Sequence, residues 1–72
     1  MQQSLEQEIG SSAGEIYEFL AKNKGEATMA KIQKNLDLKG NFAELGLGWL
    51  AREDKIELAK SGSSLKVRLR NN

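Results

Sequence analysis

The chain has 72 residues, enough for one small domain and too few for two separate hydrophobic cores. It contains no Cys and no His, which excludes disulfides, thiolate or imidazole metal sites, and Ser-His or Cys-His catalytic pairs. Hydrophobic residues make up 39% and charged residues 29% of the sequence, which is typical of a folded soluble protein rather than a disordered one. Composition therefore favours a binding protein over an enzyme, and we expect no metal and no cofactor.

Nothing in the sequence predicts a membrane span or an export signal. No apolar run approaches the roughly 18 residues that a transmembrane helix needs. The first twenty residues hold four Glu but no Lys or Arg, which is the opposite of a secretory leader. We therefore expect a single cytoplasmic domain over residues 1–72, with no membrane partner.

The net charge of +1 conceals an uneven distribution. All eleven Lys and Arg residues lie after position 20, where there are only six Asp and Glu. The last twelve residues carry Lys66, Arg68 and Arg70 and no acid. A basic segment on a nearly neutral chain indicates an anionic partner, and the alternative is that these side chains only keep the surface solvated.

The first predicted element is a helix that begins after Ser4 and ends at residues 23–25. Ser4 followed by Gln7 is typical of a capping box, and Asn-Lys-Gly is typical of a helix C-terminus with Gly in the left-handed conformation. Apolar residues recur at spacings of three and four, which places them on one face. The predicted core face consists of Leu5, Ile9, Ala13, Ile16 and Leu20.

Two shorter helices follow an extended piece at residues 26–28. Thr28 is the expected N-cap of a helix over residues 29–36, and Asn41 is the expected N-cap of a third helix that ends near Arg52. Residues 37–40 form the turn between them. The inward residues of the two helices would be Met29, Ile32, Leu36, Ala43, Leu47 and Leu50.

The periodicity then changes from that of a helix to strict alternation. Two alternating runs are separated by Ser-Gly-Ser-Ser at residues 61–64, which predicts a β-hairpin with one face on the core and one in solvent. The predicted inward residues of the hairpin are Ile56, Leu58, Leu65, Val67 and Leu69.

This order of elements is that of a winged helix-turn-helix domain, an α+β fold with three helices and a C-terminal hairpin as the wing. Residues 47–56 (LGWLAREDKI) resemble the end of the third helix and the start of the wing in that family. Residues 10–20 and 28–38 are similar to it as well, so the resemblance covers nearly the whole chain. It is closest to small stand-alone prokaryotic proteins catalogued mainly as a domain of unknown function, and it implies DNA binding in a role related to transcription.

The residues themselves favour phosphate contacts over base contacts. On the predicted outer face of the third helix, only Asn41 and Arg52 can donate to base edges, and Glu44 on that face repels phosphates. The cations of the second helix, the following turn and the wing are expected to bind phosphates, provided that they share one side. These six residues are Lys31, Lys34, Lys39, Lys66, Arg68 and Arg70.

The third helix also carries a second apolar stripe of Phe42, Leu45 and Trp49. One hypothesis makes this stripe an exposed patch for a protein partner or a second copy of the chain. The other buries it, with Trp49 under the wing and Phe42 against the second helix. Tyr17, beside the core face of the first helix, raises the same question. The alternative to a DNA-binding protein is therefore an interaction or dimerisation module without base recognition, and no small-molecule substrate is expected.

Overall fold

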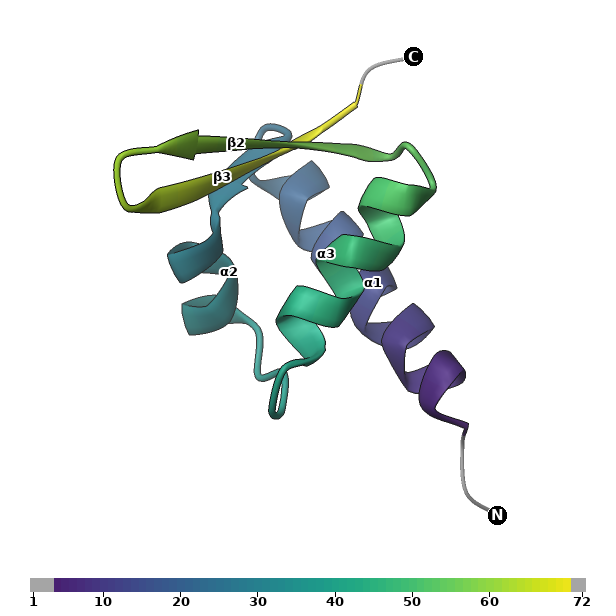
Figure 1. Cartoon of the computed structure of the whole chain (residues 1–72). Helices are drawn as coiled ribbons and strands as arrows, with labels where there is room; N and C mark the ends of the chain where they lie inside the picture. The colour runs from purple at the N-terminus through teal and green to yellow at the C-terminus, as the bar shows by residue number, and fades with distance from the viewer. Residues whose placement is uncertain (1–3, 71–72) are drawn as a thin grey trace.

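A computed structural model describes residues 4–70 as three helices and a three-stranded antiparallel sheet (Figure 1). The predicted α+β winged helix-turn-helix architecture is confirmed, with each predicted element present and the second helix one residue shorter than expected. The elements in chain order are α1 (Leu5–Lys22), β1 (Glu26–Thr28), α2 (Met29–Asn35), α3 (Phe42–Arg52), β2 (Ile56–Ser61) and β3 (Ser64–Leu69).

The ends of α1 follow the local signals of the sequence. The Ser4 hydroxyl accepts the Gln7 amide hydrogen at 3.2 Å and the Gln7 side chain accepts that of Ser4 at 3.2 Å, so the capping box is confirmed. At the other end Gly25 has a positive φ of 86°, as predicted, and its amide donates to the Leu20 carbonyl. Lys24 also has a positive φ, 63°, so a residue with a Cβ occupies the left-handed cap position.

The two helices of the helix-turn-helix begin differently. The Thr28 hydroxyl accepts the amide hydrogen of Lys31 at 3.2 Å, which confirms Thr28 as the N-cap of α2. Asn41 stands at the N-cap of α3, but its side chain makes no capping hydrogen bond, so that part of the prediction is wrong. The reason is its backbone, with φ −106° and ψ 24°, which differs from the extended conformation in which a cap side chain reaches the next turn.

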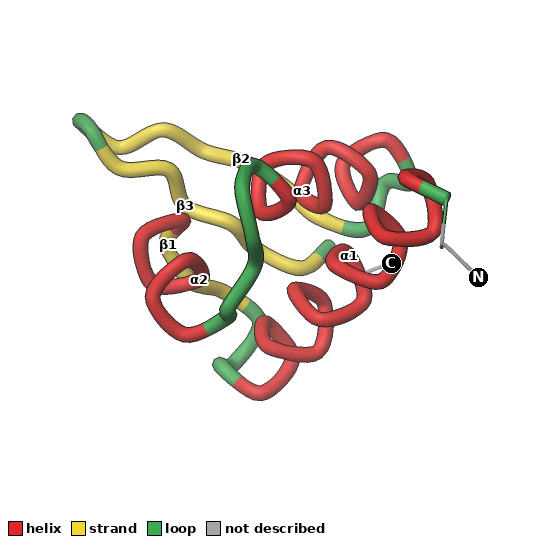
Figure 2. Tube along the Cα trace, turned by 90° about the horizontal axis from the view of Figure 1, so that it is seen from below, coloured by secondary structure: helices red, strands yellow, loops and turns green. Residues whose placement is uncertain are grey.

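The sheet has the order β1-β3-β2, so the last strand in sequence is the central one. Glu26 pairs with Arg68 on one side of β3, and Ile56 pairs with Leu69 on the other. All three helices lie on the same face of the sheet (Figure 1), and the view from below shows α1 and α3 side by side (Figure 2). The molecule therefore has two layers, and alternate residues of each strand face either the helices or solvent.

The core fills the space between these layers. Two predicted core positions are wrong: Leu5 is 59% exposed and Leu58 is 45% exposed. The first turn of α1 extends beyond the shorter α3 that it packs against, and β2 is an edge strand with a neighbour on one side only. The buried hydrophobic residues are Ala13, Ile16, Leu20, Ala27, Ile32, Ala43, Leu47, Leu50, Ile56 and Val67.

Gly46 sets the distance between α1 and α3. A Cβ at this position would lie 2.9 Å from Ile16 Cδ1, closer than real Cβ contacts, and 3.2 Å from the backbone nitrogen of Ala13, tighter than most of them. Absence of a side chain at Gly46 thus allows the two helix backbones to approach each other. This contact packs one face of α3 against α1, and the face of α3 that carries Glu44 and Gly48 is exposed.

Candidate nucleic-acid interface

The helix-turn-helix unit presents exposed cations that have no acidic partner among the described residues. Lys31 and Lys34 lie on α2, Lys39 lies in the connection to α3, and Arg52 lies in the last turn of α3. All four side chains are exposed, and none of them forms an ion pair within residues 4–70. Their charge is therefore available to an anionic ligand.

The exposed face of α3 offers few groups that can recognise a base. Asn41 and Arg52 are exposed, as predicted, but about 16 Å apart along the helix axis at 1.5 Å per residue. Between them Glu44 is exposed, and its carboxylate accepts a long hydrogen bond of 3.5 Å from the Gln33 amide. A Cβ on Gly48 would meet no atom within 4 Å, so the middle of this face is open surface. The geometry suits close backbone approach better than base recognition.

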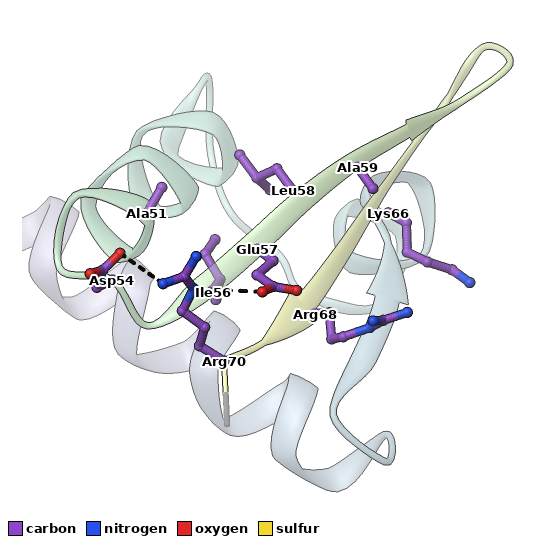
Figure 3. Close-up of a pocket in the computed structure, with 9 residues that line it drawn as sticks. All are labelled: Ala51, Asp54, Ile56, Glu57, Leu58, Ala59, Lys66, Arg68 and Arg70. Carbon is purple, nitrogen blue, oxygen red and sulfur yellow. Dashed lines mark hydrogen bonds and ion pairs between the residues drawn. The ribbon is translucent and has the colours of Figure 1, made fainter. Parts of the chain in front are cut away.

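Lys66, Arg68 and Arg70 lie on the sheet face that points away from the helices, together as predicted (Figure 3). The first two share one acid of the neighbouring strand β1. Arg68 Nε is 3.3 Å from one carboxylate oxygen of Glu26, and Lys66 Nζ is 3.9 Å from the other. The strand register explains this contact, because Glu26 lies directly opposite Arg68.

Arg70 is paired as well, at the base of the hairpin. One of its guanidinium nitrogens lies 3.4 Å from an Asp54 carboxylate oxygen, and its Nε lies 3.7 Å from Glu57 (Figure 3). Three acids, Glu26, Asp54 and Glu57, thus oppose the three cations of this face. Its net charge is close to zero, although the sequence of β3 alone is strongly basic.

The six predicted phosphate-binding cations do not form one surface. The three of β3 and its end point away from the helices, whereas Lys31, Lys34 and Lys39 belong to the helical layer on the other side of the sheet. The sequence alone does not determine this arrangement. It divides the set into a neutralised group on the sheet and an unpaired group on the helix-turn-helix.

Lys60 is a wing cation that the sequence analysis did not single out. It lies near the tip of the hairpin, opposite Leu65, and alternation places it on the same side of the sheet as Ile56 and Leu58. Its side chain is exposed and makes no ion pair within residues 4–70. Counting every second residue from Ile56 would have found it. Lys60 therefore faces the helical side of the molecule, where the unpaired cations of α2 also belong.

An aromatic groove of about 330 Å³ lies between α1 and α3. Tyr17 and Trp49, which line it, are 42% and 39% exposed. A Cβ on Gly10 would lie 3.8 Å from the Trp49 ring, so Trp49 lies against α1 and the predicted packing under the wing is wrong. The Lys55 ammonium lies 5.9 Å from the centre of the Tyr17 ring, at cation–π distance.

The other two members of the apolar stripe are less accessible. Phe42 and Leu45 are both half-buried. Phe42 lines a shallow depression of about 250 Å³ with residues of α1 and of the connection before α3. The three residues of the stripe lie on one side of α3, but only Trp49 among them is exposed.

Residues 4–70 hold no group of three or more acidic side chains placed to bind a metal ion. In the same range there is no helix long and apolar enough to cross a membrane.

Comparison with known proteins places the chain among winged helix domains. The family model described as "Winged helix-turn-helix domain (DUF2582)" matches residues 1–69. The chain belongs to this family. It is also similar to the "Uncharacterized protein MJ1608" of Methanocaldococcus jannaschii, with 38% identity over 65 residues that cover 86% of this chain and 90% of that protein. Neither description names a ligand, so the function of this winged helix domain has to be argued from its surface.

Proposed function

We propose that this winged helix domain is a DNA-binding protein related to transcription, which holds duplex DNA mainly through its phosphates. The observation that carries the proposal is the set of exposed, unpaired cations on the helix-turn-helix unit within residues 4–70. Each phosphate neutralised by such a cation releases counterions, which supplies affinity without regard to base sequence. The contacting residues would be Lys31, Lys34, Lys39, Arg52 and, at the wing tip, Lys60.

The orientation follows from how helix-turn-helix domains usually dock, with α3 in the major groove and the wing beside the backbone. The open surface at Gly48 lets the helix backbone approach the groove closely. Asn41 and Arg52 would make the few base contacts, while Glu44 disfavours a deep fit because it is exposed on the same face. We therefore expect weak sequence preference and a strong dependence on salt.

The cations of β3 have a smaller part in this proposal than in the sequence-based prediction. Lys66, Arg68 and Arg70 each have an acidic neighbour, so phosphate binding there has to displace an ion pair. All of these pairs are partly exposed, and such pairs are individually weak. We expect these three residues to modulate affinity rather than to determine it.

Fluorescence anisotropy with a labelled random-sequence duplex tests the proposal at about 50 and 200 mM salt. With Arg52 assigned to a base, the four phosphate contacts of Lys31, Lys34, Lys39 and Lys60 predict a slope of log affinity against log salt near −3.6, which is a loss of about 150-fold between these two conditions. The double variant Lys31→Ala/Lys34→Ala should flatten the slope by about 1.8.

The matched control is Arg68→Ala/Arg70→Ala, which removes the same formal charge from the sheet face and should change the slope by less than about half as much. If Arg68→Ala/Arg70→Ala flattens the salt slope and Lys31→Ala/Lys34→Ala does not, the proposed contact surface is wrong. Absence of binding at about 50 mM salt refutes DNA binding itself.

A second function is favoured by the aromatic groove. Tyr17 and Trp49 are both partly exposed and line the same groove, and exposed apolar patches often bind proteins. In this alternative the domain is an interaction or dimerisation module that uses Trp49 and the exposed parts of Phe42 and Leu45. In either case the proposed role is binding rather than catalysis, and a cytoplasmic location remains a prediction.

Trp49 is the single Trp of the chain, so its fluorescence reports on this groove alone. Emission that shifts to shorter wavelength on concentration or on addition of a partner would support the second function. Emission that is independent of concentration and partner would contradict it. Tyr17→Ser should abolish such a shift without unfolding the protein, because Tyr17 is largely exposed.

A further inference from the structure

Within residues 4–70, the backbone groups on the outer edge of β2 pair with no other strand. β3 is the central strand, so β2 has a neighbour on one side only. Five of its six residues are exposed, and no other segment within residues 4–70 pairs with its free edge. Such an edge can accept a further strand.

The hydrogen-bond alternation of the hairpin shows which residues face this edge. The hairpin closes at the pair Ser61 and Ser64, and in an antiparallel ladder every second pair exchanges hydrogen bonds. The bond from the Arg70 amide to the Lys55 carbonyl, 2.9 Å long, continues the same alternation. Residues 57, 59 and 61 therefore bond to β3. Ile56, Leu58 and Lys60 direct one N–H and one C=O each away from it, which leaves six free groups.

The middle residue of this edge also exposes apolar surface. Leu58 is 45% exposed, and among the described strand residues it is the one large hydrophobic side chain that is exposed. Natural sheets commonly protect an edge with Pro, with a bulge or with an inward-pointing charge. The chain contains no Pro, and the β2–β3 ladder is continuous without a bulge, so Lys60 is the one such device on this strand.

We propose that two copies of this chain associate through their β2 edges into one six-stranded antiparallel sheet. The edge is self-complementary about a two-fold axis. With Leu58 opposite Leu58 of the second copy, Ile56 lies opposite Lys60 at both ends, and all six free backbone groups of each copy are paired. A register shifted by two residues leaves part of each edge without a partner.

The side chains are compatible with this register. The two Leu58 side chains meet on the helical side of the sheet and remove each other from water. Lys60 of the second copy comes opposite Ile56, next to the C-terminal end of α3, where Glu53 at the C-cap and Arg52 in the last turn carry opposite charges. On the outer face Glu57 lies opposite Ala59 and keeps its ion pair with Arg70.

The dimer is expected to be weak. One pair of six-residue strands buries less than the roughly 1,600 Å² of a standard stable interface. We therefore expect association between about 0.01 and 1 mM. The proposal does not rest on DNA binding, since it uses neither Lys31 nor the exposed face of α3. The two proposals share only Lys60, which the dimer removes from the set of phosphate contacts.

Sedimentation and amide hydrogen exchange of the whole chain test the proposal at about 0.01 and 1 mM. In the dilute sample the amides of residues 57, 59 and 61 should be protected, and those of Ile56, Leu58 and Lys60 should exchange quickly. In the concentrated sample the second set should gain protection while the apparent mass doubles. A chain that stays monomeric at the higher concentration, or a dimer in which these three amides stay unprotected, overturns the proposal.

Charge variants at the two-fold axis test the register. Leu58→Lys and Leu58→Glu each bring like charges together and should weaken association by more than about tenfold, whereas an equimolar mixture should associate again. Leu5→Lys, which changes an exposed leucine far from the sheet, should dimerise like the unmodified chain. Unaltered dimerisation of Leu58→Lys, or loss of the dimer in Tyr17→Ser, would place the contact elsewhere.

Discussion

The close contact of α1 and α3 can be tested with two glycines of the same helix. Replacing Gly with Ala inside a helix stabilises it by about 0.8–1.0 kcal/mol. At Gly48 a Cβ would meet no atom within 4 Å, so Gly48→Ala should retain this gain. At Gly46 the same methyl group would lie 2.9 Å from Ile16 Cδ1 and 3.2 Å from the Ala13 nitrogen. Ile16 is fully buried and the second atom is backbone, so neither moves easily.

Overpacking of this kind costs about 1–3 kcal/mol. After the gain in helix propensity, Gly46→Ala should lower the free energy of unfolding by up to about 2 kcal/mol, while Gly48→Ala should raise it by nearly 1 kcal/mol. For a domain of this size each 1 kcal/mol corresponds to about 4–8 °C in the melting temperature. Urea unfolding and thermal melts followed by circular dichroism would separate the two variants clearly.

A double variant identifies the atom responsible. Ile16→Val removes Cδ1, so it should lessen the cost of Gly46→Ala and give a favourable coupling of at least about 0.5 kcal/mol in a double-mutant cycle. If Gly46→Ala and Gly48→Ala stabilise the protein equally, the two helices do not approach each other as described. If the coupling is absent, the contact with the Ala13 backbone rather than with Ile16 limits the space at Gly46.

Four further variants test three other features by urea unfolding. Lys24→Gly should stabilise the protein by about 0.5–1 kcal/mol, because it removes a Cβ from a left-handed helix cap, and a loss of stability would contradict this. Leu20→Ala should cost about 2–5 kcal/mol, whereas Leu5→Ala should change stability by less than about 0.5 kcal/mol; similar costs would mean that the first turn of α1 is packed. Arg70→Ala should cost less than about 1 kcal/mol and even less in 1 M salt, since its ion pairs are half exposed.

Local signals in the sequence were sufficient for the elements and most of the core. The capping box at Ser4, the cap at Thr28 and the change from helical to alternating periodicity each depend on neighbours within a few residues. Such contacts can be recognised without the fold. The failures at Leu5 and Leu58 have a different cause, because periodicity shows which face a residue occupies but not whether another element covers it.

The surface was harder to predict because it depends on strand register. Arg68 meets Glu26 across 42 residues of sequence, and no local pattern shows that the two lie side by side. The basic appearance of β3 was therefore misleading, since its partners come from β1 and from the start of the hairpin. The position of Trp49 against α1 likewise depends on the closeness that Gly46 allows between two helices.

The place of β3 in the sheet has a consequence for the order in which the domain folds. β3 is the central strand and also the last in sequence of the elements within residues 4–70, and its Val67 is fully buried. During synthesis β1 has no partner until β3 emerges, so folding cannot proceed element by element from the N-terminus. The contact between α1 and α3 does not need β3, but the side of the helices that faces the sheet stays uncovered until β3 completes the fold in one cooperative step.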